Sequence, residues 1–199
     1  RVTDMNLMFW QAEAFNKDIG SWDVGSVTNM RGMFDEAEAF NQNIGSWDVD
    51  QVTDMSFMFN SALNFNQDIG DWNVSEVTEM LAMFSNAETF NQDISNWEVG
   101  QVTDMGFMFQ DASSFDQDIG SWDVSAVTEM QGMFNSFIHP MSFNQDISSW
   151  DVGQVDNMNS MFEENDVFNQ DISGWNVSNV TDMNDMFENA DAFNQDISS

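Results

Sequence analysis

The chain has 199 residues, of which 42% are apolar, and its 35 acidic residues against three basic ones give a net charge of −32. This apolar content is enough for a core, so the chain is not a disordered acidic tail, and its charge excludes nucleic acid and anionic membranes as partners. The absence of cysteine excludes disulfides, zinc thiolates and thiol catalysis.

Tryptophan recurs at a fixed interval along the chain. Steps of 25, 25, 25, 25, 28 and 25 residues separate Trp22, Trp47, Trp72, Trp97, Trp122, Trp150 and Trp175. A fixed period of this length is typical of a repeat solenoid, in which each coil buries its apolar face against its neighbours. We therefore expect residues 1–199 to form one array of about eight coils. Both ends fall inside a repeat, which suggests a fragment that lacks its two capping repeats.

Each coil begins with Ile-x-x-Trp-x-Val, as in residues 44–49. Trp47 and Val49 are two residues apart and fall on one face of a short strand, with Asp48 on the other. Val-Thr-Asp-Met-x-x-Met-Phe-x-x-Ala follows, as in residues 52–62, and its apolar spacing predicts a helix of about three turns. Thr53 is the expected N-cap of this helix.

Stacking such coils places the strands in one parallel sheet and the helices in a second layer. Tryptophan, isoleucine, methionine and phenylalanine then fill the core between the layers. The sequence thus predicts an α/β repeat solenoid, with short parallel strands on one side and short helices on the other.

The repeated run Phe-Asn-Gln-Asp-Ile-Ser-x-Trp-Asp-Val-Ser-x-Val-Thr-Asp-Met-x-x-Met-Phe-x-x-Ala resembles the repeat of the BspA-type leucine-rich-repeat surface proteins. It is also similar to a repeat of unknown function in mycoplasma lipoproteins. The resemblance covers nearly the whole chain. It implies a leucine-rich-repeat-like fold and a non-enzymatic array displayed at a cell surface for adhesion or interaction, and it supplies no catalytic residue.

One residue of the expected helix alternates between large and small side chains. The residue two past the first methionine of each coil reads, in order, Leu7, Gly32, Phe57, Ala82, Phe107 and Gly132. Two interpretations are open. The large side chains pack over small residues of neighbouring coils, or they form an apolar patch for a partner.

The segment 135–142 breaks the repeat. Nine residues separate Phe134 from Phe143, where six separate Phe34 from Phe40. The segment is either an insertion tolerated in a surface loop or an apolar recognition loop on an acidic array. Its candidate interaction residues are Phe137, Ile138, His139, Pro140 and Met141.

Stacking turns each repeated acidic position into a row. The first row follows the tryptophans on the solvent face, and its candidate binding or cation residues are Asp23, Asp48, Glu98, Asp123 and Asp151. The second row precedes the isoleucines and contains Asp18, Asp68, Asp93, Asp118, Asp146, Asp171 and Asp196. A third row follows the threonines and contains Asp4, Asn29, Asp54, Glu79, Asp104, Glu129 and Asp182.

Like charges on adjacent coils repel one another. Protonation, screening by salt or binding of a hard cation such as calcium would reduce this repulsion. No EF-hand or β-roll calcium motif is present. Rows of acids are also typical of a solvated face, and turns favour aspartate. Calcium at these rows is the one cofactor that the sequence leaves open.

With one histidine, one lysine and no cysteine, the chain has no catalytic triad or thiolate pair, and we expect no enzyme. Sequons at Asn73, Asn176 and Asn179 would matter in a host that glycosylates secreted proteins. We expect an extracellular or cell-surface stalk or adhesion module that binds proteins or glycans. The alternative is a calcium-binding, self-associating filament or surface-layer segment. No apolar run is long enough to insert directly into a membrane.

Overall fold

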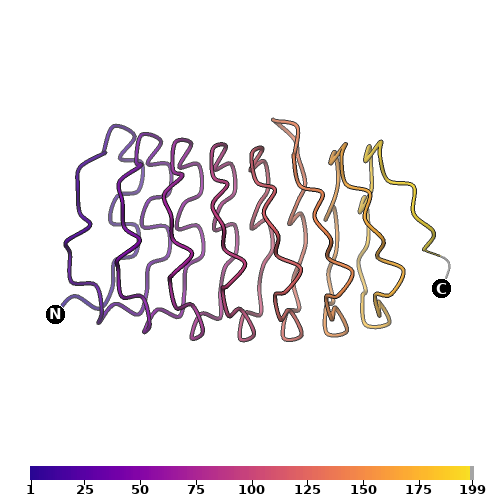
Figure 1. Ribbon diagram of the computed structural model, residues 1–199, viewed down its shortest axis with the longest axis horizontal. Coiled ribbons are helices and arrows are strands. Elements are labelled where there is room, and N and C mark those ends of the chain that lie inside the picture. The colour runs from indigo at the N-terminus through magenta and orange to yellow at the C-terminus, as the bar shows by residue number, and fades with distance from the viewer. Residues whose placement is uncertain (198–199) are drawn as a thin grey trace.

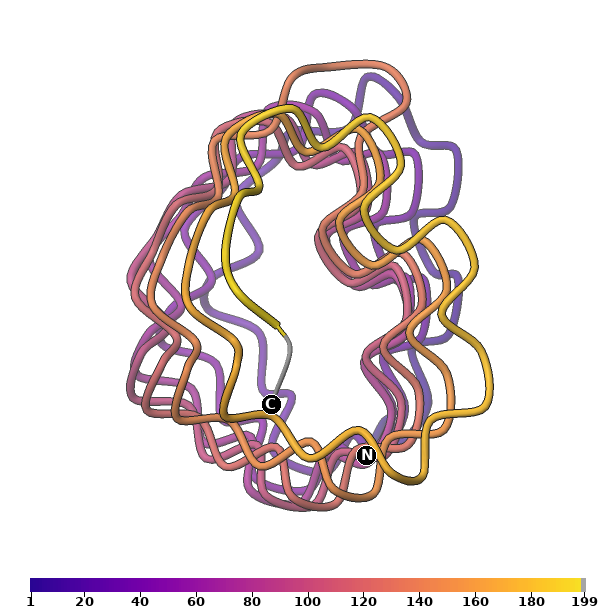
Figure 2. The same cartoon turned by 90° about the vertical axis from the view of Figure 1, so that its right-hand side faces the viewer.

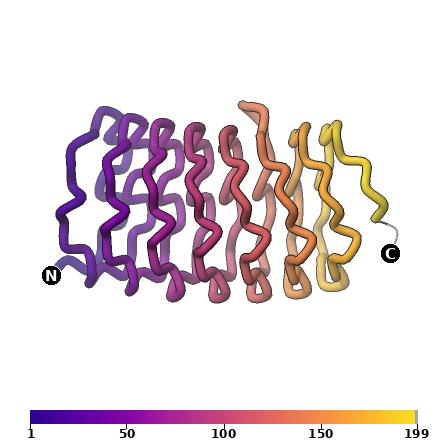
Figure 3. The backbone as a smooth tube through the Cα atoms, viewed as in Figure 1, coloured from indigo at the N-terminus to yellow at the C-terminus, as the bar shows by residue number. Residues whose placement is uncertain are grey.

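The computed structural model describes residues 1–197. The chain winds around one axis in successive loops of similar outline that stack along this axis (Figure 1). Each such loop is called a coil below. Seen along that axis, the coils lie over one another around a common interior (Figure 2). The first coil and the last described coil lie at opposite ends of the stack (Figure 3).

The prediction of helices and strands is wrong. Within residues 1–197 no residue is helical, and pairing between coils consists of isolated parallel bridges, one residue in each coil. The bridge residues are Asp4, Asn29, Asp54, Glu79, Asp104, Glu129, Asn157 and Asp182. The chain is therefore not an α/β array with a layer of short helices opposite a sheet of short strands.

The segment expected to be helical is a run of overlapping β-turns. In residues 55–65, several N–H groups each donate to the carbonyl three residues earlier, at 2.9 to 3.1 Å: Met58, Asn60, Ala62 and Phe65. An α-helix would instead join each N–H to the carbonyl four residues earlier. Thr53 consequently caps no helix; its N–H and its hydroxyl both donate to the carbonyl of Thr28 in the preceding coil, at 2.9 and 3.2 Å.

From Met55 to Ser61, every second N–H group points to the next coil. Phe57 donates to the carbonyl of Leu81 at 2.8 Å, and Phe59 donates to that of Met83 at 2.9 Å. Met55 and Ser61 do the same toward Glu79 and Ser85. Alternate amides thus close turns within a coil and join neighbouring coils, so every one of them has a partner.

This arrangement requires residues in the left-handed region. Phe57 has φ of 59° and Ser61 has φ of 54°, and the corresponding residues of most other coils also have positive φ. A positive φ at the third residue is the geometry of a type II turn, and it costs an L-residue about 1–2 kcal/mol. The hydrogen bonds to the next coil hold these residues there.

The alternating large and small residues occupy the first of these left-handed positions. A Cβ atom on Gly32 would collide with Leu7, and one on Gly132 would collide with the ring of Phe107. Large side chains of one coil therefore cover small residues of the next, although no helices are involved.

The Ile-x-x-Trp segment is also a turn, closed by the Trp47 N–H donating to the Ile44 carbonyl at 3.0 Å. The alternation expected from the sequence nevertheless holds. Trp47 and Val49 are buried, whereas Asp48 between them is exposed. The strand prediction was therefore right about which side chains face the core and wrong about the backbone.

Stacked phenylalanine rings run through the core. Phe34 lies 4.0 Å from Phe40 of the same coil and 5.6 Å from Phe59 of the next, measured between ring centroids, and all three rings are nearly parallel. The same contacts recur from Phe9 to Phe193. These rings are fully buried in the inner coils, so a tyrosine hydroxyl would find no water there.

The tryptophans carry a polar group into the core and satisfy it between coils. The indole N–H of Trp72 donates to the carbonyl of Ile44 in the preceding coil at 3.2 Å, and the same bond recurs from Trp47 to Trp175. Each tryptophan thus fixes its coil relative to the one before it.

A row of asparagines joins the coils in the same way. The side-chain oxygen of Asn66 accepts the backbone N–H of Asn91 at 3.0 Å and the Gln92 amide at 2.8 Å. Asp116 replaces asparagine once and still accepts from Asn144 and Gln145. The position therefore requires an acceptor oxygen and not an amide group.

Replacing Gly132 with alanine tests the left-handed position. Gly132→Ala adds a Cβ at φ of 58° that collides with Phe107, and we expect it to lower the free energy of unfolding by about 2 kcal/mol. The control is Gly174→Ala, whose Cβ would meet nothing within 4 Å, and we expect a change within about 0.5 kcal/mol. Urea unfolding measures both, and equal stability of the two variants would contradict the assigned backbone.

Two substitutions of one asparagine test the amide row. Asn66→Ala leaves the N–H of Asn91 and the Gln92 amide without their acceptor, and we expect a loss of about 2 kcal/mol. Asn66→Asp keeps the acceptor oxygen, as Asp116 does, and should cost less than half as much. Thermal or urea unfolding compares them, and equal losses would show that the acceptor oxygen is not what matters.

Candidate functional site

The first acidic row lies on the surface, as expected. Asp23, Asp48, Glu98, Asp123 and Asp151 are all exposed. Several side-chain oxygens of this row accept the backbone N–H two residues later. Asp48 accepts from Asp50 at 3.2 Å, and Asp151 accepts from Gly153 at 3.0 Å. These carboxylates therefore stabilise local turns.

The second acidic row has the same local role. Its members are exposed, and most accept the N–H two residues later at 2.9 to 3.1 Å: Asp18, Asp68, Asp93, Asp118, Asp146 and Asp171. Asp196, also exposed, lies in the last described coil. Both rows were found from the repeat alone, and their turn bonds explain why aspartate recurs there.

Serine neighbours hold four of these carboxylates ionised. The hydroxyl and then the backbone N–H of the serine two residues later lower the pKa of Asp93, Asp123 and Asp146. The N–H and then the hydroxyl of Ser173 lower the pKa of Asp171. These four carboxylates therefore stay charged to lower pH than free aspartate would.

The third row supplies all of the bridge residues except Asn157, and its members are partly buried except for the exposed Asp4. Burial, followed by repulsion from Asp104 and Asp54, raises the pKa of Glu79. Burial also raises the pKa of Asp104, although the Gly106 N–H bond opposes it. Charge repulsion between coils is therefore felt in this row, and asparagine replaces the acid at Asn29 and Asn157.

The geometry offers calcium no ready-made cluster. Among residues 1–197, no three His, Asp or Glu side chains come close enough to hold a metal ion together. The rows align one carboxylate per coil, and one oxygen of most carboxylates in the first two rows already accepts a turn N–H. In the same range, no helix is long and apolar enough to cross a membrane.

The inserted segment projects from the stack as a loop (Figures 1 and 2). Phe137 and Ile138 are 57% and 65% exposed, Pro140 is exposed and His139 is partly exposed. Met141 is only 3% exposed and belongs to the core. Of the five candidate interaction residues, Met141 is therefore not available to a partner.

Asp111 anchors the loop from the preceding coil. One of its carboxylate oxygens accepts the N–H groups of Phe137 and Ile138, both at 2.8 Å, and that of His139 at 3.4 Å. Asp111 is 3% exposed. Sequence reasoning missed this residue, and the signal that could have found it is its place one coil before the insertion.

Two further contacts fix the sides of the loop. His139 Nε2 lies 3.0 Å from a carboxylate oxygen of Glu88, and the Ser142 hydroxyl donates to the Ser113 carbonyl at 2.7 Å. Beneath the loop, Asn135 is fully buried and its amide has no partner in the protein. Such a group is the kind that an ordered water satisfies.

The sequons lie on the surface, and each asparagine already makes hydrogen bonds. The side-chain oxygens of Asn73 and Asn176 accept the N–H of Ser75 and Ser178, both at 3.2 Å. The Asn179 amide donates to the Gly153 carbonyl at 2.6 Å.

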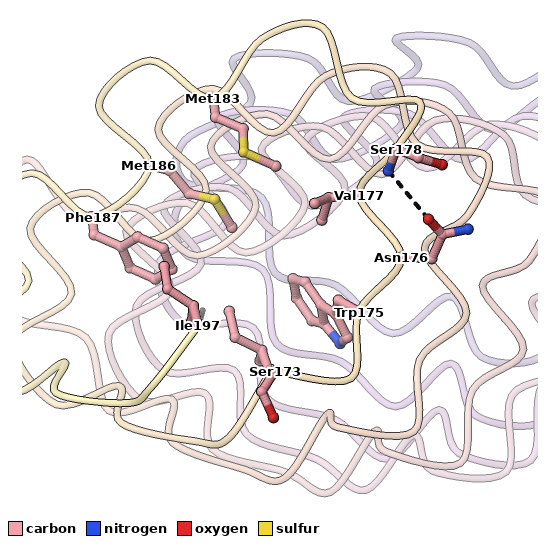
Figure 4. A pocket seen from close by; sticks show the side chains of 10 residues that line it. Ser173, Trp175, Asn176, Val177, Ser178, Met183, Met186, Phe187 and Ile197 are labelled. Atoms are coloured by element: carbon pink, nitrogen blue, oxygen red, sulfur yellow. Dashed lines mark hydrogen bonds between the residues drawn. The ribbon is translucent and has the colours of Figure 1, made fainter. Parts of the chain in front are cut away.

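Two hollows lie in the surface of the described residues. One lies along the first acidic row and is lined by Trp72, Asn73, Asn96 and Glu98 with their neighbours. Another, of about 410 Å³, lies in the last described coils and is lined by Trp175, Val177, Met183, Met186 and Ile197 (Figure 4). The matching methionines one coil earlier are fully buried, so this hollow is the uncovered face of the core.

The stacked coils with their recurring side chains define a repeat protein. Residues 1–88, 45–138 and 135–199 match the family described as Mycoplasma protein of unknown function, DUF285. Because these matches cover the chain from end to end, the chain belongs to this family. No curated protein and no solved structure matches it. These comparisons do not extend to the BspA-type leucine-rich-repeat proteins.

Replacing Asp104 with asparagine tests the cost of partly burying a charge in the third row. At neutral pH the buried charge is unfavourable, because the pKa of Asp104 is raised in the folded chain. Asp104→Asn keeps the acceptor for the Gly106 N–H, and we expect a gain of about 0.5 kcal/mol at pH 7, since solvent screens this half-exposed group.

The gain should disappear below the ordinary pKa of 3.8, where the native carboxyl is protonated in both the folded and the unfolded chain. Asp123→Asn is the control, and it should bring no gain at pH 7, because Ser125 stabilises the charged form of Asp123. Urea unfolding at pH 7 and at pH 3 measures both variants. A gain of equal size at the two pH values would rule out charge as its cause.

Proposed function

We propose that the chain is a non-enzymatic module of a cell-surface protein that serves as an acidic stalk and as an interaction surface for basic proteins. The proposal rests on the way in which the acidic side chains of the rows are arranged. The carboxylates of the first two rows face solvent and most of them accept turn N–H groups, as Asp48 and Asp118 do, so they present negative charge along the array.

The chemistry of the surface favours a basic protein over other partners. The net charge of −32 repels nucleic acid and anionic lipid and attracts cationic surfaces from a distance. The resemblance of the repeat to BspA-type surface proteins and to mycoplasma lipoproteins supports a place at the cell surface. The repeat length changes in residues 135–142, and this insertion is the place where specific recognition is expected.

Binding to synthetic polycations tests the interaction function. We expect poly-lysine to bind with an affinity that falls steeply as salt rises, because many weak contacts along the rows contribute. Heparin and DNA should not bind. Surface plasmon resonance at several salt concentrations measures this, and binding of the anionic probes, or none of poly-lysine, would contradict the proposal.

A parallel measurement tests the alternative function, a calcium-dependent filament. Thermal unfolding and sedimentation are compared in calcium and in sodium chloride at equal ionic strength. Because no acidic cluster is available within residues 1–197, we expect the same melting temperature and the same assembly state in both salts. A saturable stabilisation or an assembly seen only with calcium would favour the filament instead.

A further inference from the structure

Phe137 and Ile138 form an exposed apolar pair that we term the knob. Most of the other exposed large apolar side chains among the described residues lie in the first coil or the last coils: Val2, Leu7, Met8, Trp10, Val177, Met183 and Ile197. The one exception is Val167. The knob therefore lies where the coils otherwise bury such side chains, and its loop projects beyond its neighbours (Figure 1).

We propose that the knob docks into an apolar groove rimmed by lysine or arginine side chains on a partner protein. The inference rests on the interaction function proposed above and names the place and the chemistry of specific binding. The acidic rows attract basic proteins in general, and the knob selects among them.

The knob is held in place before any partner arrives. Asp111 binds the backbone N–H groups of both knob residues at 2.8 Å. Met141 anchors the far end of the loop in the core, and Ser142 bonds to the preceding coil. A loop that is only tolerated needs no such anchoring, and a loop already ordered loses little entropy on binding.

The charges around the knob define the rim of the partner groove. A Glu88 carboxylate oxygen lies 3.0 Å from His139 on the loop, and Glu163 belongs to the coil on the other side, where its backbone carbonyl accepts the Ser136 N–H. The three basic residues, Arg1, Lys17 and Arg31, all belong to the first two coils. A groove with acidic rims would be repelled here, whereas basic rims are complementary.

Two synthetic peptides of equal charge provide the test. One is a helical peptide of leucine and lysine, whose apolar face is rimmed by lysine, and the other has serine in place of each leucine. The native chain should bind the leucine peptide about 10-fold more tightly, since burial of one large apolar side chain suffices for that difference. Fluorescence anisotropy at one salt concentration measures both affinities.

The knob variant is Phe137→Ser combined with Ile138→Ser, and the matched control is Val167→Ser, which changes an exposed apolar residue outside the loop. The preference for the leucine peptide should disappear in the knob variant and remain in the control. Unchanged thermal unfolding of both variants verifies the fold, because all three side chains are exposed.

Each other outcome overturns the inference in its own way. A preference that survives in the knob variant would place apolar binding elsewhere. Equal binding of the two peptides would contradict the proposed role of the knob and would be consistent with the acidic interaction function. If neither peptide binds, both proposals are contradicted. Knob-dependent binding of phosphatidylcholine vesicles, without preference for the leucine peptide, would assign the knob to a lipid surface.

Discussion

The stack depends on the division of backbone N–H groups between two directions. In each turn run, one amide closes a turn within its coil and the next donates to the following coil, as Met58 and Phe59 do. Because half of the donors are satisfied only by a neighbour, a coil cannot satisfy its own backbone. The same division holds residues such as Phe57 at positive φ, where an L-residue is otherwise unfavourable.

Side chains also find their packing and hydrogen-bond partners in the adjacent coil. The phenylalanine rings stack from coil to coil, the indole N–H of Trp72 reaches Ile44, and the side-chain oxygen of Asn66 reaches Asn91. The composition reflects these contacts, because the core takes aromatic rings without hydroxyl groups and one indole with a fixed acceptor. Polar side chains outside the core stabilise turns, and the first two acidic rows and the 135–142 loop face solvent.

The sequence revealed the period, the core positions and the acidic rows, because each depends only on which side chains recur. It did not reveal the backbone. An apolar spacing of three and four residues fits a helix, but overlapping turns of three-residue steps give the same spacing in Met55, Met58 and Phe59. The decisive feature is a residue with positive φ, such as Phe57. The sequence does not indicate it, because phenylalanine rarely adopts positive φ, whereas glycine often does. Asp111 was missed because its role arises only when the next coil lies over it.

Nuclear magnetic resonance of the chain measures this backbone arrangement most directly. The structure predicts strong intraresidue amide-to-Hα cross-peaks at Phe57 and Ser61, which positive φ produces, and a coupling across the hydrogen bond from the Phe57 amide to the Leu81 carbonyl. Weak intraresidue cross-peaks at these residues, with helical contacts between residues three and four apart through 55–62, would contradict the account.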